Sequence, residues 1–357
     1  MKRIVFTGGG TAGHVTPNLA ILEQMDRKEW EVHYVGTADG MERGLIEGRP
    51  GITYHAVSSG KLRRYFDWKN FTDPFRVLKG AGQAHSLMRK IRPAVVFSKG
   101  GFVTVPVVAG AWLARVPVIL HESDITPGLA NKLAMPFASM VCTSFPETAE
   151  HMHNKKVLHT GSPVRRSLLT GDRKKGLALS HLTGKKPVLM IMGGSTGAQA
   201  VNEAVDAALD EILAHFDIIH IRGKENLKPQ LTQKGYKQYD YVTDDLMHLM
   251  AASDIVLSRA GANAIFEFLA LKRPMLLIPY PLGASRGDQI LNAKSFAKQG
   301  YAEMLMQEDV TTDRLVTSLR QIYRNRRGYI ANMKKAGDRD TVGRIVEAIE
   351  EAAGGHV

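Results

Sequence analysis

Cysteine is nearly absent from this chain. Its 357 residues include one thiol, Cys142. A single cysteine excludes an intrachain disulfide framework, so a reducing cytosol is the expected compartment. Because Cys142 lies in the apolar stretch S-M-V-C-T-S, we expect a buried structural side chain rather than a nucleophile or a metal ligand.

Long apolar runs are absent as well. The longest apolar tract, residues 103–120, is interrupted by Pro106, Gly110, Arg115 and Pro117. A helix that spans a bilayer needs about 20 predominantly apolar residues, so the tract predicts a helix, a turn and a buried strand. The opening M-K-R runs directly into a strand-like segment, and no signal peptide is expected.

Acidic side chains are too few to balance the basic ones. The chain has 35 Asp and Glu against 47 Lys and Arg, a formal net charge of +12. This excess favours a polyanionic partner. The sequence has no zinc-ligand spacing, no RRM-type aromatic motif and no basic helix with base-reading residues, so we expect no nucleic-acid partner.

An anionic membrane surface is the remaining candidate, and residues 60–80 support it. Six Lys and Arg side chains alternate there with five aromatic rings, those of Tyr65, Phe66, Trp68, Phe71 and Phe75. Binding at a lipid interface needs both apolar insertion and attraction to anionic headgroups. The alternative is that these rings pack a helix onto its own domain.

The composition is that of a folded α/β protein, with 44% hydrophobic and 23% charged residues. The length fits two domains of about 150–200 residues each. Strand-like runs cover residues 3–7, 31–35, 53–57, 94–98, 117–120 and 140–143, then 187–192, 217–221, 239–242, 255–258 and 275–278. With helical stretches such as 16–27 and 75–90 between them, they predict a doubly wound parallel sheet in each half.

Two glycine-rich turns follow strand-like runs at corresponding places in the two halves, G-G-G-T-A-G-H at residues 8–14 and G-G-S-T-G-A at 193–198. Such a turn lets backbone N–H groups approach an anion, and the helix that follows adds about half a positive charge. The pair therefore predicts phosphate-binding sites in both halves, facing one cleft.

A nicotinamide dinucleotide is the first alternative, since Gly8, Gly10 and Gly13 satisfy G-x-G-x-x-G. A dinucleotide site needs an acid at the end of the second strand for the ribose. This chain has V-G-T at residues 35–37, and Asp39 comes late. The pattern therefore favours a different phosphate ligand.

Three candidate functional segments follow strands of the first half, at the carboxyl ends where open α/β sheets bind ligands. His14 follows the first glycine turn, and an imidazole with a reference pKa of about 6.5 suits proton transfer. The cluster H-E-S-D at residues 121–124 follows an apolar strand. Gly100 and Gly101 offer a further anion-binding turn, or an ordinary tight turn.

The second half offers sugar-binding groups. Gly261 permits close backbone approach, and Glu267 lies early in the helix that follows, where it is able to accept two hydrogen bonds from a ribose diol or to be a plain surface glutamate. Asp288, Gln289 and Asn292 follow a loop. Amide side chains both donate to and accept from sugar hydroxyls.

Taken together these motifs resemble the MurG family of peptidoglycan N-acetylglucosaminyltransferases, in glycosyltransferase family 28, and most of all its Bacillus-type members. The matching segments run in order along nearly the whole chain: G-G-G-T-A-G-H-V-T-P, S-K-G-G-F-V-T-V-P, H-E-S-D-I-T-P-G-L-A-N-K, G-S-P-V-R, G-G-S-T-G-A and S-R-A-G-A-N-A-I-F-E. The resemblance implies a GT-B fold of two Rossmann-like domains. It implies transfer of GlcNAc from UDP-GlcNAc to the MurNAc 4-hydroxyl of lipid I, giving lipid II.

The resemblance also implies which domain binds which substrate. Residues 1–163 with the terminal helix 341–357 are the acceptor-binding, membrane-associated domain, and residues 164–340 bind UDP-GlcNAc. The protein lies peripherally on the cytoplasmic face of the membrane, with partners among cell-wall synthesis and division proteins. Neither a cofactor nor a metal is implied. The D-x-D of residues 338–340 follows no strand and is expected to be a solvated surface feature.

The family's residue roles carry over by position. On the donor side they fall on Thr11, Ala12, Gly13 and Asp124 near the GlcNAc, Arg165 near the nucleotide, Ser195 at the diphosphate, Thr243 near uracil, Glu267 at the ribose and Gln289 at the GlcNAc hydroxyls. The acceptor diphosphate falls to Gly8, Gly9, Gly10, Gly100 and Gly101. His14 is the favoured base, with Glu122 its rival or its partner.

Three positions depart from the family pattern. Asp124 stands where asparagine is frequent, Thr196 where glutamine is, and Phe102 where tyrosine is. An ionised aspartate accepts from a sugar hydroxyl but does not donate to it.

Three other activities fit parts of the pattern. A UDP-GlcNAc 2-epimerase shares the two-domain layout but needs acids for proton abstraction at C2. A family-28 diacylglycerol glycosyltransferase keeps the donor half and changes the acceptor loops. A non-catalytic donor-binding subunit would lack His14 and its turn.

Overall fold

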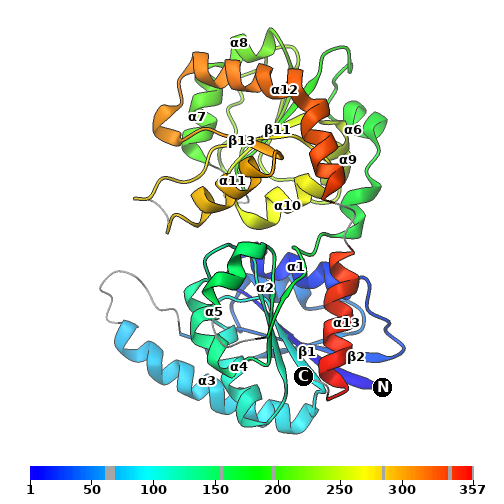
Figure 1. Cartoon of the computed structure of the whole chain (residues 1–357), viewed down its shortest axis with the longest axis vertical. Helices are drawn as coiled ribbons and strands as arrows, with labels where there is room; N and C mark the ends of the chain where they lie inside the picture. Colours follow the sequence, from blue (N-terminus) through cyan, green and yellow to red (C-terminus); the bar gives the residue numbers. More distant parts are fainter. Residues whose placement is uncertain (61–68, 153–155, 195–197, 284–285, 337–339, 356–357) are drawn as a thin grey trace. The chain divides into compact units, whose positions relative to one another are not determined.

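The computed structural model describes residues 1–60, 69–152, 156–194, 198–283, 286–336 and 340–355, with the backbone alone for 69–72. The chain divides into two compact units. The first unit comprises Met1–Arg165 together with Asp340–Val357, and the second comprises Arg166–Arg339 (Figure 1). Each unit is built around its own parallel sheet.

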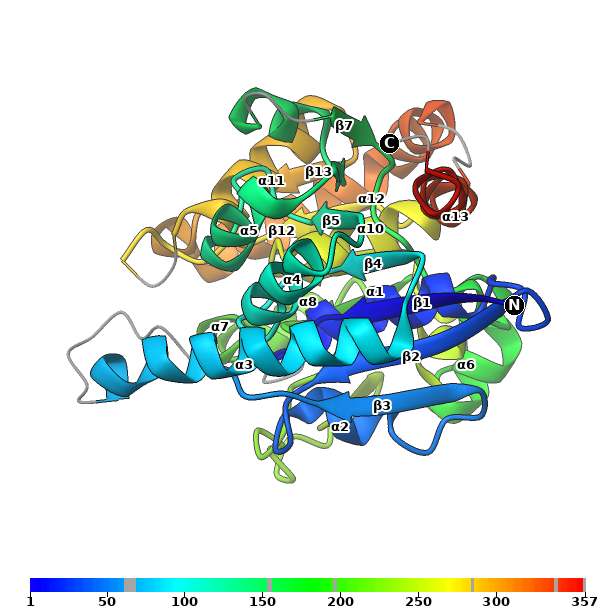
Figure 2. The same cartoon turned by 90° about the horizontal axis from the view of Figure 1, so that it is seen from below.

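The sheet of the first unit has seven strands in the order β3-β2-β1-β4-β5-β6-β7. The strands are β1 Lys2–Thr7, β2 Trp30–Gly36, β3 Ile52–Ala56, β4 Val95–Ser98, β5 Val118–Glu122, β6 Met140–Thr143 and β7 Lys156–His159. The helices are α1 Ala12–Leu22, α2 Met41–Ile46, α3 Lys69–Ile91, α4 Thr104–Leu113, α5 Leu129–Ala134 and α13 Thr341–Ala353, with short 3-10 turns at Met135–Phe137 and Pro146–His151. Helix α3 runs alongside α4 (Figure 2).

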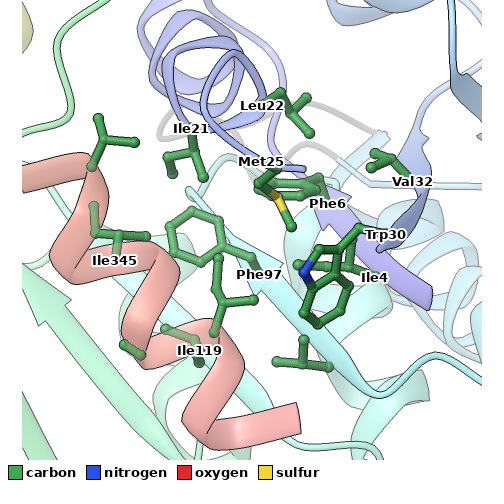
Figure 3. Packing of buried hydrophobic residues seen from close by; sticks show 14 of the residues in the cluster. Ile4, Phe6, Ile21, Leu22, Met25, Trp30, Val32, Phe97, Ile119 and Ile345 are labelled. Atoms are coloured by element: carbon green, nitrogen blue, oxygen red, sulfur yellow. The ribbon is translucent and has the colours of Figure 1, made fainter. Parts of the chain in front are cut away.

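The core of the first unit explains why the last helix joins it. Apolar residues recur along α13 at helical spacing, and the buried set includes Ile345 and Ile349. Ile345 packs in one cluster with Phe6, Phe97 and Ile119 of the central strands (Figure 3). Burial of this stripe stabilises the helix on the sheet.

The sheet of the second unit has six strands in the order β10-β9-β8-β11-β12-β13. The strands are β8 Val188–Met192, β9 Asp217–Ile221, β10 Tyr236–Tyr239, β11 Ile255–Ser258, β12 Met275–Leu277 and β13 Ala302–Met304. The helices are α6 Arg173–Leu179, α7 Gln199–Ala207, α8 Leu209–Leu213, α9 Leu246–Ala252, α10 Ala262–Ala270, α11 Asp288–Lys298 and α12 Thr312–Lys335, with 3-10 turns at Arg166–Thr170 and Gln307–Asp309.

The predicted α/β class and the two parallel sheets are confirmed, and the differences lie at the sheet edges. The strand expected at residues 239–242 is wrong, because β10 occupies Tyr236–Tyr239. Strands β7 and β13 were not predicted. All three are edge strands with polar residues among their few positions, so they lack the apolar run that marks a buried strand.

Two further expectations have clear outcomes. Residues 103–120 form α4, a turn and most of β5, as predicted, and Cys142 is fully buried in β6. Burial raises the pKa of the Cys142 thiol to about 12. Among the described residues, no helix has the length and apolar character needed to cross a bilayer.

Candidate active site

The strand order reverses between β1 and β4 in the first unit, and the two glycine turns of that unit lie at this point. The Gly9 amide donates to the Gly100 carbonyl at 3.3 Å. Gly101 has a φ of +92°, and a Cβ there would collide with the Gly9 carbonyl oxygen. The structure thus packs the two turns backbone against backbone, at the place where ligands bind in open α/β sheets.

Glu42, on α2, is hydrogen-bonded to the first glycine turn. Its carboxylate accepts from the Gly10 amide at 3.1 Å and from the amide and hydroxyl of Thr37 at 2.9 and 2.7 Å. Burial raises the pKa of Glu42, but these hydrogen bonds outweigh it, and the pKa lies below its ordinary value. The Gly10 amide, one of the groups predicted to hold a diphosphate, is therefore already bound to an anion. Sequence reasoning missed Glu42, and no local motif marks it.

His14 stands in the first turn of α1 and is held by the glycine turn before it. Its Nδ1 lies 3.0 Å from the Gly9 carbonyl oxygen and 3.1 Å from the Thr11 hydroxyl. A carbonyl oxygen only accepts, so Nδ1 carries the proton and the neutral ring keeps its lone pair on Nε2. Thr11 precedes α1 in extended backbone, and Ala12 and Gly13 are the first two residues of the helix.

Glu122 differs from its predicted place. The H-E-S-D cluster was expected after a strand, but β5 continues through Glu122 because its pairing with β6 extends that far. The side chain is only 4% exposed. Its carboxylate accepts from the amides of Ser123, Asp124 and Gly128 at 2.8, 3.0 and 2.9 Å, and from the Asn131 side chain at 2.8 Å. The carboxylate thus organises the loop that carries Asp124.

Lys99, between β4 and the second glycine turn, is 1% exposed. Its ammonium group donates to the Ser123 hydroxyl. Burial lowers the pKa of Lys99 to about 8, against the opposing effect of the Glu122 and Asp124 charges. The lysine thus joins the second glycine turn to the Asp124 loop. Lys99 lies in the S-K-G-G-F motif, but no sequence pattern predicted a role for it.

The second unit repeats the arrangement at the reversal between β8 and β11. Gly193 follows β8, and a Cβ there would collide with Ala198. Gly194 has a φ of +102°. Helix α7 starts directly after Ala198, whose methyl group has no atom to cap the helix N–H groups. Ser195 and Thr196 lie outside the described residues.

Arg259, directly after β11, contacts the loop that follows β12. Its guanidinium stacks on the Tyr280 ring at 4.2 Å and donates to the carbonyls of residues 278 and 279 at 3.0 and 3.2 Å. It also donates to the Gln307 side chain at 2.7 Å. Sequence reasoning missed Arg259, although its place in S-R-A-G at a strand end was a signal.

Two of the predicted sugar-binding side chains, Gln289 and Asn292, contact residues close to Arg259. The Gln289 Oε1 accepts from the Tyr280 amide at 3.3 Å. The Asn292 amide donates to the Ala260 carbonyl at 3.2 Å, which ties α11 to the turn before α10. Glu267 is half-buried on α10.

The remaining predicted site residues lie elsewhere. Thr243 is exposed and lines a hollow of about 290 Å³ with Tyr239 and Tyr241. Arg165 is half-buried at the end of the first unit.

Phe75 is the one predicted membrane residue whose side chain the structure describes, and it is 74% exposed on α3. Tyr65, Phe66 and Trp68 lie outside the described residues, as does the side chain of Phe71. Within the described part of the chain, no group of three or more His, Cys, Asp or Glu side chains is placed to hold a metal ion. Asp338 of the D-x-D motif is not described, while Asp340 caps α13 by accepting from the Gly343 amide at 2.8 Å.

Known proteins match the chain along its whole length. Residues 4–143 match the glycosyltransferase family 28 N-terminal domain, and residues 188–349 match its C-terminal domain. The UDP-N-acetylglucosamine--N-acetylmuramyl-(pentapeptide) pyrophosphoryl-undecaprenol N-acetylglucosamine transferase of Geobacillus kaustophilus is 53% identical over 353 residues, covering 99% of both chains.

Solved structures confirm the GT-B fold. MurG from Acinetobacter baumannii has a TM-score of 0.76 at 24% identity and covers 98% of this chain and 100% of its own. A UDP-N-acetylglucosamine 2-epimerase from Listeria monocytogenes has a TM-score of 0.72 at 11% identity, covering 98% and 96%. The fold alone is thus compatible with a glycosyltransferase and with an epimerase, whereas the 53% sequence identity favours the glycosyltransferase. The chain belongs to glycosyltransferase family 28, among the N-acetylglucosamine transferases that the Geobacillus relative represents.

Proposed function

We propose that this protein transfers GlcNAc from UDP-GlcNAc to the MurNAc 4-hydroxyl of undecaprenyl-diphosphate-MurNAc-pentapeptide, with inversion at the anomeric carbon. The observation that carries the proposal is the 53% identity, over 99% of the chain, to a relative named for this transfer. The glycine turns at the switch point of each sheet supply the matching chemistry, since both substrates contain a diphosphate.

The second unit binds the donor in this proposal. The turn at Gly193 and Gly194, Ser195 and the N-terminus of α7 hold the diphosphate of UDP. Glu267 binds the ribose and Gln289 the GlcNAc hydroxyls. The Gln289 amide supports this role because its oxygen is already fixed by the Tyr280 amide, which directs its NH₂ group as a donor.

The family resemblance assigns donor roles to six further residues. Thr243 holds uracil through main-chain groups, on the rim of its own hollow. Arg165 lies near the nucleotide. Asp124 accepts from a GlcNAc hydroxyl, with Thr11, Ala12 and Gly13 on the sugar side.

The first unit binds the acceptor diphosphate between its two turns. Gly8, Gly100 and Gly101 supply backbone groups there, and Gly9 joins the two turns through its hydrogen bond to Gly100. Glu42 already occupies the Gly10 amide, so Gly10 serves by shaping the turn, with its φ of +84°, rather than by donating. The buried Lys99 supplies a positive charge beneath this site.

The chemistry is a single displacement. The acceptor 4-oxygen forms a bond to C1 of GlcNAc as the bond from C1 to the diphosphate oxygen breaks, and the electron pair leaves with UDP. The proton of the 4-hydroxyl passes to His14 Nε2. Preorganised N–H donors and Arg165 stabilise the departing diphosphate, each worth about 2–4 kcal/mol.

Glu122 positions the site rather than acting as the base. Its four accepted hydrogen bonds engage both carboxylate oxygens in the loop after β5. The carboxylate therefore serves to hold the loop that carries Asp124.

The protein works at the cytoplasmic face of the membrane, where the acceptor's lipid tail remains. Exposed apolar side chains on α3 support this placement, since Phe75 and Leu78 are 74% and 69% exposed beside Arg76 and Lys79. The basic and aromatic segment of residues 60–80 would rest on anionic headgroups. Cell-wall synthesis and division proteins are the further partners we propose.

The test is incubation of the purified protein with radiolabelled UDP-GlcNAc and a short-chain analogue of the acceptor. We expect labelled disaccharide on the acceptor and stoichiometric release of UDP. Conversion of UDP-GlcNAc to its 2-epimer without acceptor would favour the epimerase instead. Label on diacylglycerol, offered in parallel, would favour the lipid glycosyltransferase.

A further inference from the structure

A large hollow of about 940 Å³ lies within the first unit at the carboxyl ends of β2 and β3, beside the first glycine turn. Its walls include Gly10 and Thr37 after β1 and β2, Ser58 after β3, and Arg76 and Lys79 of α3. Gly10 also belongs to the turn proposed for the diphosphate, and Arg76 and Lys79 to the basic segment proposed for the membrane.

The size of the hollow suits a ligand larger than a small anion. Pockets for drug-sized ligands span about 300–1,000 Å³, so this hollow is at the upper end and has room for a short peptide. A diphosphate would fill only a small part of it.

The charged side chains in the wall also favour a peptide over a purely anionic ligand. Arg76 and Lys79 are exposed on neighbouring turns of α3, whereas Asp39, Glu42 and Asp73 contribute carboxylates. A purely anionic ligand would meet these three acids. A peptide presents neutral amides along its length and a carboxylate at its end, which suits a wall of mixed sign.

Polar groups suited to amides line the hollow as well. The Gln83 Oε1 accepts from the Ser58 amide at 2.8 Å, which fixes the side chain and turns its NH₂ group into a directed donor. Ser59 adds a hydroxyl, and Phe102 and Val103 add apolar surface. Such a wall is able to pair with peptide N–H and C=O groups and to cover small apolar side chains.

The chemistry of the acceptor places a peptide here. In muramic acid one sugar ring carries the diphosphate on C1, the reacting hydroxyl on C4 and the peptide on the lactyl arm of C3. The three sites must therefore be neighbours. Gly10 belongs to the turn proposed for the diphosphate and also lines the hollow, and His14 follows four residues later.

We propose that this hollow binds the peptide stem of the acceptor, with Arg76 and Lys79 receiving its carboxylate end. The inference rests on the proposed function and deepens it, because it names a second part of the acceptor that the first unit binds in addition to the diphosphate.

The test compares two acceptors on the same short polyprenyl diphosphate, one with the full pentapeptide and one with the stem cut to its first residue. Both are assayed in neutral detergent without anionic lipid, so membrane attraction does not contribute. The variant is Arg76→Ala with Lys79→Ala. The control is Arg89→Ala, exposed on the same helix and outside the hollow.

We expect the double variant to lose about tenfold in kcat/KM with the pentapeptide acceptor, mainly through KM, as two charge-assisted contacts disappear. With the shortened acceptor it should match the wild type, and KM for UDP-GlcNAc should not change. Equal losses with both acceptors, or no loss with either, would overturn the stem site. A wild type that makes no product with either acceptor would instead overturn the proposed function itself.

Discussion

His14 Nδ1 lies 3.0 Å from the carbonyl oxygen of Gly9. The contact couples the two features that the sequence singled out in its first motif, the glycine turn and the histidine after it. Because the carbonyl accepts, the ring is held in the tautomer whose Nε2 takes up a proton. The turn thus both shapes the proposed phosphate site and prepares the base beside it.

Replacing His14 with alanine should lower kcat by about 10²-fold or more, the usual contribution of a general base. Binding of UDP-GlcNAc, measured by calorimetry, should stay near the wild-type affinity because the donor is held by the second unit. His151→Ala, at an exposed histidine of the same unit, serves as the control. Wild-type turnover in His14→Ala would remove the histidine from the reaction.

Replacing Glu122 with glutamine should mainly destabilise the fold. An amide NH₂ would face donors that now meet a carboxylate oxygen, so we expect the free energy of unfolding to fall by about 1–3 kcal/mol. Urea unfolding measures this change, with the exposed Glu150→Gln as control. If stability were unchanged while kcat fell as far as in His14→Ala, Glu122 would be the base.

Lys99 should make stability depend on pH in the alkaline range. Its folded pKa of about 8 lies below the unfolded value of 10.5, so the unfolded state binds more protons between these values and stability rises with pH across them. Below pH 8 the fold bears the full cost of the buried charge, on the order of 3 kcal/mol.

The matching variant is Lys99→Met, which keeps the length and removes the charge. Its unfolding free energy should lack the rise between pH 8 and 10.5. Its activity should fall because the hydrogen bond from residue 99 to the Ser123 hydroxyl is lost. Lys132→Met, at an exposed lysine, should keep the rise. A rise that persists in Lys99→Met would assign it to another group.

Replacing Phe75 and Leu78 with serine should weaken binding to vesicles that contain anionic lipid, because two exposed apolar side chains no longer insert. Vesicle co-sedimentation at fixed ionic strength is the measurement. Turnover with a short-chain acceptor in detergent should be retained. Trp112→Ser, at an exposed ring of α4, tests whether binding extends to the neighbouring helix. Undiminished sedimentation of the Phe75 and Leu78 variant would move the membrane surface elsewhere.

Replacing Glu267 with alanine should raise KM for UDP-GlcNAc and leave KM for the acceptor unchanged, since one carboxylate would no longer bind the ribose diol. Steady-state kinetics with each substrate varied in turn separates the two constants. Glu303→Ala, at a half-buried glutamate of the same unit, is the control. An unchanged donor KM would remove Glu267 from the ribose site.

The central strands and glycine turns could be predicted because their signals are local. β1 and β8 are apolar runs that end in glycines, and both conformations follow from a few neighbouring residues. The helix of residues 341–353 was likewise visible from its apolar stripe, and its bounds in the structure agree.

The tertiary supports of the site could not be predicted. Glu42 reaches Gly10 across 32 positions of sequence, and Lys99 reaches Ser123 across 24. Arg259 braces Tyr280 across 21. Such contacts depend on which strand lies beside which, and strand order is not written in any local pattern. The hydrogen bonds that the Glu122 carboxylate accepts come instead from nearby residues 123–131, but nothing in the H-E-S-D motif marks them.

The stereochemistry of the product is the sharpest test of the proposed single displacement. Proton NMR of the disaccharide formed from UDP-GlcNAc reports the configuration at the new anomeric carbon through its H1–H2 coupling. We predict a β-linked GlcNAc on the MurNAc 4-oxygen, inverted from the α-linked donor, and formed by the wild type about 10²-fold faster or more than by His14→Ala. An α-linked product, or a β-linked product formed equally fast by the variant, would contradict it.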